Sequence, residues 1–466
     1  MTNPIMNTVD LSKRSLPHLL GAIPAYHRLY QYYSEKNFRK HYRDVLRSQW
    51  FSIEDMGVYQ SEHLQQIIRH AYHNVPYYKN LFDKFKISVD EIKSPSDLLK
   101  IPILEKDQVK QYYGHFKALG CERFRPSAHK TSGSTGMPLK VLIDQNVDSI
   151  GSALIWRHYN WAGRKFHSRA AYITMPFGFG SGRIDSENLF VINSTKRTLK
   201  INSALINGET LDQICRLLEE FRPSHIESYP SLMNVFAKFL MESPDYDIRP
   251  HSITLRAEKL YPVQRELLED VFQCPCFEFY GMWEYLVFAA ECEYHCLHLD
   301  FELGIVEIVK NGRLCPIGEI GEIVATGIHN YSMPLIRYAT GDYGYIRNEV
   351  CQCGREMPII EIVGGREKDL IVTRKGFFNV MSGLPLMLGK DNIIKQIQFY
   401  QENKDTLIVR LVKGEEFSDS DREGVKGAIS NYLLNSIDIT LEFLEYIPRT
   451  AAGKYKYVIS KVPIEV

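Results

Sequence analysis

The stretch HKTSGSTGMPLKV, residues 129–141, constrains this chain more than any other. It places four hydroxyl side chains and two glycines in the six positions from Thr131 to Gly136. Glycine lets the backbone bend until several N–H groups point into one concavity, and such a concavity holds phosphate oxygens. It is not a Walker loop, because no Gly-Lys-Ser/Thr sequence follows. The stretch predicts a phosphate-binding loop, and a flexible Ser/Gly turn is the alternative if no other segment completes a nucleotide site.

Length and composition indicate a globular protein with more than one domain. The chain has 466 residues, of which 44% are hydrophobic and 24% are charged, and its formal net charge is zero. This balance argues against the basic surface of a nucleic-acid binder. No apolar run reaches the length of a transmembrane helix, and the N-terminus lacks the layout of a signal peptide. We expect a cytoplasmic protein with no stable membrane insertion and no nucleic-acid partner, and the pattern leaves a homodimer open.

The order of helix and strand patterns predicts an α/β fold. Helical spacing dominates the chain up to Val75-Pro76, where a helix is expected to stop. From Lys130 to Glu227, buried-strand patterns alternate with helices such as Leu211–Phe221, which is typical of parallel strands. Strand patterns with glycine-rich turns dominate from Phe301 to Ile346. Residues 1–365 are therefore expected to form a large N-terminal domain of α/β sheets with a β-rich part.

A domain boundary is expected near Gly364-Gly365-Arg366, beyond which residues 366–466 form a small, mobile α+β domain. Ser420 and Glu423 fit a capping box that opens a helix running to about Leu434. The expected strands are two hairpin pairs and one later strand: Leu370–Thr373 with Phe377–Val380, Ile394–Tyr400 with Thr406–Val412, and Ile439–Leu444.

Two glycine turns in the large domain carry carboxylates suited to a nucleotide. Tyr280-Gly281-Met282-Trp283-Glu284 follows a strand pattern, so Glu284 could hold Mg²⁺ while Tyr280 packs against a flat base. Asp342 follows Gly341, and one carboxylate can accept hydrogen bonds from both ribose hydroxyls. Taken singly, each motif also fits an ordinary turn.

Two basic motifs flank the small domain. Arg366, in Gly365-Arg366-Glu367-Lys368-Asp369, could reach a ribose or phosphate, or merely pair with a surface acid. Lys454 stands in a glycine-bearing loop near the C-terminus, where a mobile point charge suits a developing negative charge. An ordinary basic tail is the alternative for Lys454.

In this order the five segments resemble the superfamily of adenylate-forming enzymes, across about Ala71 to Lys454. Within it the chain looks most like the phenylacetate–CoA ligase family and its capsular-polysaccharide relatives. The narrower resemblance rests on Asn74-Val75-Pro76-Tyr77-Tyr78, on the phosphate loop without an immediate lysine, and on Ser228-Tyr229-Pro230-Ser231. Since Leu139 separates Lys140 from the loop proline, Lys140 is not included among the catalytic residues.

The resemblance implies a role for each motif. Glu284 would bind Mg²⁺, and Lys454 would stabilise the adenylation transition state with Arg366 in contact with the nucleotide. Asp342 would hold the ribose, Tyr280 and Gly281 would line the adenine and acyl site, and Lys368 would be the hinge. The ATP phosphates would be clamped by Thr131, Ser132, Gly133, Ser134, Thr135 and Gly136.

The implied reaction is attack of a substrate carboxylate on the α-phosphorus of ATP with release of pyrophosphate, followed by acyl transfer. The expected ligands are ATP, Mg²⁺ and a small carboxylic acid, with the CoA thiol as the default acceptor. An amine of an amino sugar or amino acid is the alternative acceptor, as in polysaccharide biosynthesis. A degenerate nucleotide-binding scaffold is the competing class, which the retention of Glu284, Asp342, Arg366 and Lys454 argues against.

Six of the nine cysteines are clustered, which points to a metal site. Cys292, His298, Cys351 and Cys353 supply three thiols and an imidazole, a set that closes a tetrahedral structural zinc site. His295 and Cys296 are alternative ligands. Reduced, partly buried cysteines without metal are the simpler reading, and Cys274-Pro-Cys276 fits that reading.

Overall fold

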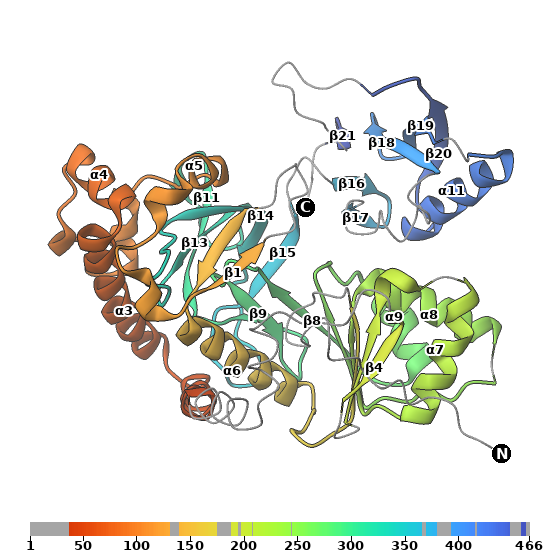
Figure 1. Cartoon of the computed structure of the whole chain (residues 1–466), viewed down its shortest axis with the longest axis horizontal. Helices are drawn as coiled ribbons and strands as arrows, with labels where there is room; N and C mark the ends of the chain where they lie inside the picture. The colour runs from red at the N-terminus through yellow and green to blue at the C-terminus, as the bar shows by residue number, and fades with distance from the viewer. Residues whose placement is uncertain are drawn as a thin grey trace, which may run out of the picture.

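The computed structural model describes residues 37–130, 139–174, 188–193, 197–206, 208–243, 245–365, 370–379, 393–414, 417–447 and 458–462. It has an α/β fold with a large N-terminal domain and a small C-terminal domain, as the sequence predicted (Figure 1). The predicted boundary at 365/366 coincides with the start of a segment outside the described residues. Within the described part, no helix has both the length and the apolar character needed to cross a membrane.

The N-terminal part is helical and packs on one side of the large domain (Figure 1). Its main helix begins with a capping box, in which Ser52 and Asp55 each bond the other's backbone N–H. It ends before Val75, which is extended because Pro76 follows. The helices here are α3 (Ile53–Asn74), α4 (Pro76–Phe85) and α5 (Lys106–Gln111), joined by the short 3₁₀ turns η2 (Val89–Glu91), η3 (Pro95–Lys100), η4 (Tyr113–Phe116) and η5 (Cys121–Phe124).

An eight-stranded sheet forms the centre of the large domain, in the order β10-β9-β8-β7-β6-β3-β5-β4. The five strands from β5 to β8 in that order are parallel, and the edge strands are antiparallel. The strands are β3 (Ala170–Thr174), β4 (Phe190–Ile192), β5 (Thr198–Asn202), β6 (His225–Ser228), β7 (Ser252–Arg256), β8 (Cys276–Gly281), β9 (Phe288–Glu291) and β10 (Leu297–Leu299).

Helices cover both faces of this sheet. Apolar side chains of α7 (Gly208–Phe221), α8 (Pro230–Glu242) and α9 (Pro262–Phe272) share one core cluster with Ile173, Ile226 and Leu255. Cys215 of α7 lies in that core. The other face is covered by α6 (Gln145–Trp161), whose buried residues join the core of the helical N-terminal part.

A second, antiparallel sheet of five strands has the order β12-β11-β13-β14-β15. It consists of β11 (Gly304–Lys310), β12 (Arg313–Leu314), β13 (Gly321–Gly327), β14 (Tyr338–Ile346) and β15 (Ile360–Gly365). Beside it lies the hairpin of β1 (Ser127–Lys130) and β2 (Lys140–Ile143), in which Lys130 pairs with Lys140. The predicted phosphate loop, Thr131 to Gly136, joins these two strands and lies outside the described residues.

The small domain contains a four-stranded sheet, a two-stranded hairpin and one helix. The sheet has the order β20-β19-β18-β21 and includes a strand, β21 (Val458–Ser460), that the sequence did not predict. The other elements lie within two residues of the predicted bounds: β16 (Leu370–Thr373), β17 (Gly376–Asn379), β18 (Ile394–Gln401), β19 (Thr406–Lys413), α11 (Asp419–Tyr432) and β20 (Asp438–Phe443).

The predicted capping box of α11 was placed two residues too late. The helix is capped by Ser418, whose backbone N–H donates to Asp421 at 2.8 Å. Ser420 therefore lies in the first turn of the helix. Both serines have an acid three residues further on, so the sequence offered two equivalent starts and the backbone uses the earlier one.

Candidate active site and metal centre

Two of the predicted nucleotide motifs meet where β8 ends beside β14. Tyr280 lies at the carboxyl end of β8, and its hydroxyl donates a hydrogen bond to Asp342 of β14 at 2.7 Å. Burial, followed by the charge of Asp342, raises the pKa of Tyr280 well above its usual value, so the phenol stays a donor. Residues 62 positions apart thus form one polar contact at a strand end, which is where α/β sheets bind ligands.

Glu284 joins the same cluster from the turn between β8 and β9. Its side chain is buried, and the hydroxyl of Tyr338 donates to its Oε1 at 3.4 Å. Burial raises the pKa of Glu284, while the charge of Lys106 acts in the opposite direction. A buried carboxylate of this kind is stabilised by a nearby cation, so the position suits a divalent metal ion.

Lys106 is a site residue that the sequence reasoning missed. It is the first residue of α5, and the preceding segment is held against β14 by two backbone hydrogen bonds. Leu104 donates to Arg337 O at 2.8 Å, and Ala339 donates to Leu104 O at 3.0 Å. The charge of Lys106 acts on Glu284 only because of this tertiary pairing, so no local motif marks the lysine.

Arg337, the first residue of the Asp342 motif, has a structural position. Its guanidinium binds both carboxylate oxygens of Glu307, at 3.0 and 2.9 Å, and the carbonyl of Ile101 at 2.6 Å. All three groups belong to the packing that holds the segment before α5 in place. Arg337 therefore positions Lys106 indirectly and is not free to contact a ligand.

Two non-glycine residues beside the site have a left-handed backbone. Ala257, directly after β7, has φ of 66°, and Tyr285, directly after Glu284, has φ of 54°. Such φ values cost free energy for residues with a Cβ atom and tend to occur at functional sites. The hydroxyl of Tyr285 donates to Asp148 of α6 at 3.1 Å, which fixes the turn that carries Glu284.

The remaining predicted nucleotide residues lie outside the described residues. They are the phosphate loop from Thr131 to Gly136, Arg366, Lys368 and Lys454. The cluster of Tyr280, Glu284 and Asp342 is thus the part of the predicted site that the structure brings together, and it gains Tyr338 and Lys106.

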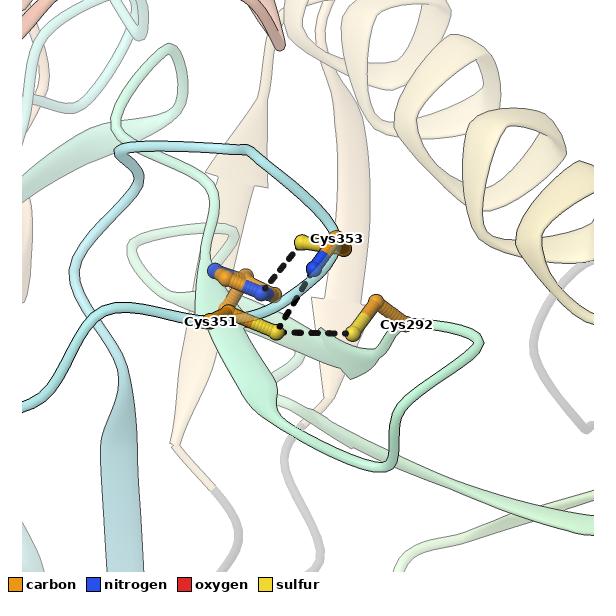
Figure 2. A group of neighbouring side chains, drawn as sticks. Cys292, Cys351 and Cys353 are labelled. Atoms are coloured by element: carbon orange, nitrogen blue, oxygen red, sulfur yellow. Dashed lines mark hydrogen bonds between the residues drawn. The ribbon is translucent and has the colours of Figure 1, made fainter.

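The predicted metal ligands converge in one place (Figure 2). One ligand atom from each of Cys292, His298, Cys351 and Cys353 lies within 4.8 Å of all the others. The Sγ atoms of Cys292 and Cys351 are 3.5 Å apart, and Cys353 Sγ is 3.4 Å from His298 Nε2. In a tetrahedral zinc site with bonds of about 2.0–2.3 Å, ligand atoms are separated by about 3.5–3.8 Å, so the donor set fits zinc.

His298 presents the correct nitrogen to the cluster. Its Nδ1 lies 2.9 Å from the carbonyl oxygen of Met357, so Nδ1 carries the proton and Nε2 is left as the metal-facing lone pair. Burial lowers the pKa of His298, which keeps the ring neutral as a ligand must be.

The two alternative ligands differ in position. Cys296 borders the cluster, because it contributes a hydrogen bond to the Cys351 thiol. Burial opposes ionisation of that thiol, but the hydrogen bonds from Cys353, Cys296 and Cys292 lower its pKa overall. His295 stacks on Phe277 at 5.3 Å and lies 3.0 Å from an Arg265 nitrogen, on the other side of the hairpin. Cys274 and Cys276 lie in the apolar core under α9, which agrees with the interpretation of these two residues as reduced cysteines without a metal.

Comparison with known proteins shows which proteins this chain resembles. The CapK C-terminal domain family matches residues 366–461. Phenylacetate-coenzyme A ligase from Thermus thermophilus is 25% identical over 445 residues, which covers 87% of this chain and 96% of the relative. Protein CapK from Staphylococcus aureus is 21% identical and covers 92% of this chain and 94% of the relative. The small domain thus matches the CapK C-terminal domain family, and the chain is similar along most of its length to proteins named phenylacetate-coenzyme A ligase and Protein CapK.

Solved structures agree with the predicted fold. A 2-hydroxyisobutyryl-CoA ligase in the postadenylation state matches with a TM-score of 0.60 at 15% identity. The match covers 89% of this chain and 91% of the ligase. At that identity the likeness concerns the fold, which confirms the predicted large α/β domain with a small C-terminal domain.

Proposed function

We propose that this protein activates a carboxylic acid with ATP. A carboxylate oxygen attacks the α-phosphorus, pyrophosphate leaves, and the product is an acyl-adenylate whose acyl group then passes to the thiol of CoA. The observation that carries the proposal is the contact of Tyr280 with Asp342 beside the buried carboxylate of Glu284. Relatives named phenylacetate-coenzyme A ligase along most of the chain support the same chemistry.

The described residues divide the proposed work. Asp342 accepts hydrogen bonds from the ribose hydroxyls, and Tyr280 and Gly281 lie beside the adenine. Glu284 would hold Mg²⁺, which would supply positive charge against the phosphates. Lys106 opposes the effect of burial on the pKa of Glu284 and adds a second positive charge close to the metal position. The reaction needs no activated nucleophile, since positioning and charge neutralisation suffice.

The predicted residues outside the described part complete the proposed site. Thr131 to Gly136 clamp the phosphates, Arg366 contacts the nucleotide, and Lys454 stabilises the transition state when the small domain closes. Lys368 is the proposed hinge. The substitution Lys454→Ala is expected to abolish adenylate formation while the protein still folds, as circular dichroism would verify.

We further propose that Cys292, His298, Cys351 and Cys353 bind one structural Zn²⁺. The fit of their ligand atoms to a tetrahedral site and the fixed tautomer of His298 support this assignment. Protein purified without chelator is expected to contain one equivalent of zinc, measured by mass spectrometry with inductively coupled plasma. A content far below one equivalent refutes the zinc assignment and leaves the adenylation proposal intact.

ATP–pyrophosphate exchange tests the proposed activation step. A panel of fatty, aryl, hydroxy, dicarboxylic and amino acids is expected to include at least one that supports exchange. The variant Glu284→Gln is expected to lose exchange by about 100-fold, because the metal loses a charged ligand. If no acid supports exchange in the unaltered protein, the degenerate-scaffold reading replaces this one.

The acceptor is decided by a second assay with the active acid. With CoA, we expect a thioester and stoichiometric AMP. If an amino sugar or amino acid yields an amide and CoA yields nothing, the amine alternative takes its place.

A further inference from the structure

The sheet face under α6 is polar, although it is buried. In the register of the sheet, Tyr172 of β3 lies beside Glu227 of β6, which lies beside Thr254 of β7. Arg256 stands two residues beyond Thr254 and so shares this face. Tyr159 of α6 donates its hydroxyl to Glu227, which places the helix over these side chains. The opposite face is mainly apolar and packs under α7, α8 and α9, although Ser228 and Glu278 also lie on it.

Two arginines lie within this polar layer. Arg256 Nη2 donates to Glu227 Oε2 at 2.7 Å, and its guanidinium lies 4.6 Å from the centre of the Phe279 ring. Arg164 lies 4.2 Å from the ring of Tyr159. Their exposed fractions are only 6% and 7%, so both guanidinium groups are removed from bulk water. One carboxylate, Glu227, faces two permanent positive charges.

The hydrogen-bonding capacity of these arginines is largely unused. In the described part of the chain, Nε and Nη1 of both Arg164 and Arg256 have no hydrogen-bond partner, and neither does Oε1 of Glu227. Nε2 of His225 is also unpartnered, and burial together with the two arginines lowers the pKa of that ring far enough to keep it neutral. Buried polar groups left unpaired cost about 1–3 kcal/mol each, so this layer suits a polar occupant.

The neighbouring ionic group does not supply the missing acceptors. Arg157 binds Asp300 and Glu302, each at 2.5 Å, and His158 lies 2.8 Å from Asp300. These carboxylates lie against Arg157, His158 and Ser48, whose hydroxyl donates to Glu302 at 2.5 Å; in the described part of the chain Asp300 Oδ2, which faces His158, has no hydrogen-bond partner. The unpartnered nitrogens of Arg164 and Arg256 therefore need a different partner.

Arg256 lies directly beside the candidate active site. It is the last residue of β7 and pairs in register with Phe279, the residue immediately before Tyr280. The left-handed Ala257 follows it at once. Ligands of α/β sheets bind outside the carboxyl ends of the parallel strands, so Arg256 stands at the inner limit of that crevice.

We propose that Arg256, held by Glu227 and assisted by Arg164, forms the inner end of the acid-binding pocket. This inference rests on the proposed function. The geometry points to an acid that carries a second oxygen acceptor at its far end: a hydroxy, oxo or dicarboxylic acid. Such a group receives the free guanidinium N–H groups. An unsubstituted fatty or arylacetic acid leaves these N–H groups unpaired, and sites built to hydrogen-bond a substrate reject analogues that lack the group.

ATP–pyrophosphate exchange with acids of one chain length tests this inference. The probes are butyrate, 4-hydroxybutyrate, 4-oxobutyrate and succinate, with phenylacetate as the aryl acid. The unaltered protein is expected to use the polar acids with kcat/KM at least about tenfold above butyrate. Arg256→Met is expected to remove that preference by raising the KM of the polar acids, whereas the exposed Arg249→Met should keep it. Arg256→Met alone leaves the buried Glu227 carboxylate without its cation. The double variant Arg256→Met with Glu227→Gln is therefore measured as well, because it removes that unpaired charge.

The outcomes separate this inference from the function on which it rests. If butyrate or phenylacetate is the best substrate, activation stands and the polar pocket is wrong. If Arg256→Met lowers kcat/KM equally for every acid, Arg256 supports the fold and does not select the acid. If no acid supports exchange, the proposed function fails and the inference fails with it. Should both Arg256 variants be unfolded by circular dichroism, the substrate order of the unaltered protein decides alone.

Discussion

At the scale of residues, Glu284 links elements that are distant in the sequence. Glu284 is a buried residue of the turn after β8. It accepts a hydrogen bond from Tyr338 of β14, and the positive charge of Lys106 from α5 acts on its carboxylate. Burial favours the neutral carboxyl, and Lys106 favours the carboxylate. The balance between these two effects sets how readily Glu284 can hold a metal ion at neutral pH.

Replacing Lys106 therefore tests this balance. Lys106→Met removes the opposing charge, so the pKa of Glu284 rises further and less of it is ionised at neutral pH. Exchange activity is expected to fall by about tenfold or more at pH 7. The acid limb of its pH profile should shift to higher pH, and more Mg²⁺ should be needed. The control Lys110→Met alters a lysine of the same helix that pairs with Asp107. Equal profiles for the two variants contradict the assignment of Lys106.

Glu278 makes a second prediction, which concerns stability. Burial raises its pKa to about 7, with Lys259 acting in the opposite direction. Because the folded pKa lies above the usual glutamate value of 4.5, the folded state binds the proton more tightly than the unfolded state. Its contribution to stability is complete at low pH and declines as the pH rises from about 4.5 to about 7.

Denaturant melts of the unaltered protein and of Glu278→Gln measure this dependence. The glutamine variant should lack the decline that Glu278 causes, so the stability difference between the two proteins should change with pH and level off above pH 7. A difference that is constant from pH 5 to pH 8 contradicts the raised pKa.

At the scale of elements, α6 and the turn after β8 fit each other closely. A Cβ atom at Gly151 of α6 would lie 2.4 Å from Cε1 of Tyr285, and the Tyr285 hydroxyl bonds Asp148 on the same helix. Glycine in a helix interior is unfavourable by itself, so its presence here is explained by the ring that packs against it. The helix thus supports the turn that carries Glu284.

Gly151→Ala is expected to destabilise the protein by about 1–3 kcal/mol, because the ring must move. Exchange activity should fall as well, since the Glu284 turn moves with Tyr285. The matched control is Gly424→Ala in α11, where an added Cβ meets nothing within 4 Å. That change should stabilise by about 0.4–1 kcal/mol in urea unfolding. Equal effects of the two changes show that α6 does not hold the turn.

Elements with a strong local signal were predictable from the sequence. The hairpin of β16 and β17 follows a pattern of apolar residues and a turn glycine, and the structure places both strands within a residue of the prediction. The start of α11 was wrong because two overlapping capping patterns compete. The strand β21 was missed, since it is short and is defined by its pairing with β18, far away in the sequence.

The same division holds for the site. Tyr280, Glu284 and Asp342 follow recognisable turns, and the four metal ligands are marked by residue type. Lys106, Arg164 and Arg256 have no such mark. Their roles depend on which strands lie side by side, and a single sequence does not specify that register.

At the scale of the whole molecule, the proposed zinc ligands join the two sheets of the large domain. His298 lies in β10 of the eight-stranded sheet, and Cys351 and Cys353 lie between β14 and β15 of the five-stranded sheet. An isolated bridge between His298 and Ile359 marks the same junction. Because Glu284 and Asp342 come from these two sheets, the junction fixes their relative position.

Loss of the proposed zinc is therefore expected to lower both stability and activity. Cys351→Ser should lower the melting temperature, and a strong chelator should lower that of the unaltered protein to a similar value. The chelator should not affect the variant further. Cys315→Ser, which changes a half-buried cysteine outside the cluster, is the control. A chelator effect that persists in Cys351→Ser contradicts the assignment.

The two domains meet where Tyr261, the residue before α9, stacks on Phe378 of β17 at 4.8 Å. Phe378 in turn contacts Tyr432 of α11 edge to face. Among the described residues, this aromatic contact is one of the places where the two domains touch, and β15 of the large domain also lies close to β17.

The measurement that tests the central claim most directly is oxygen transfer from the substrate. The acid that supports exchange is labelled with ¹⁸O in both carboxylate oxygens and is converted with ATP and the acceptor. If the carboxylate attacks the α-phosphorus, one labelled oxygen stays on phosphorus when the acyl group leaves, so mass spectrometry will find AMP carrying one ¹⁸O. Unlabelled AMP, or ADP with label in inorganic phosphate, contradicts the account.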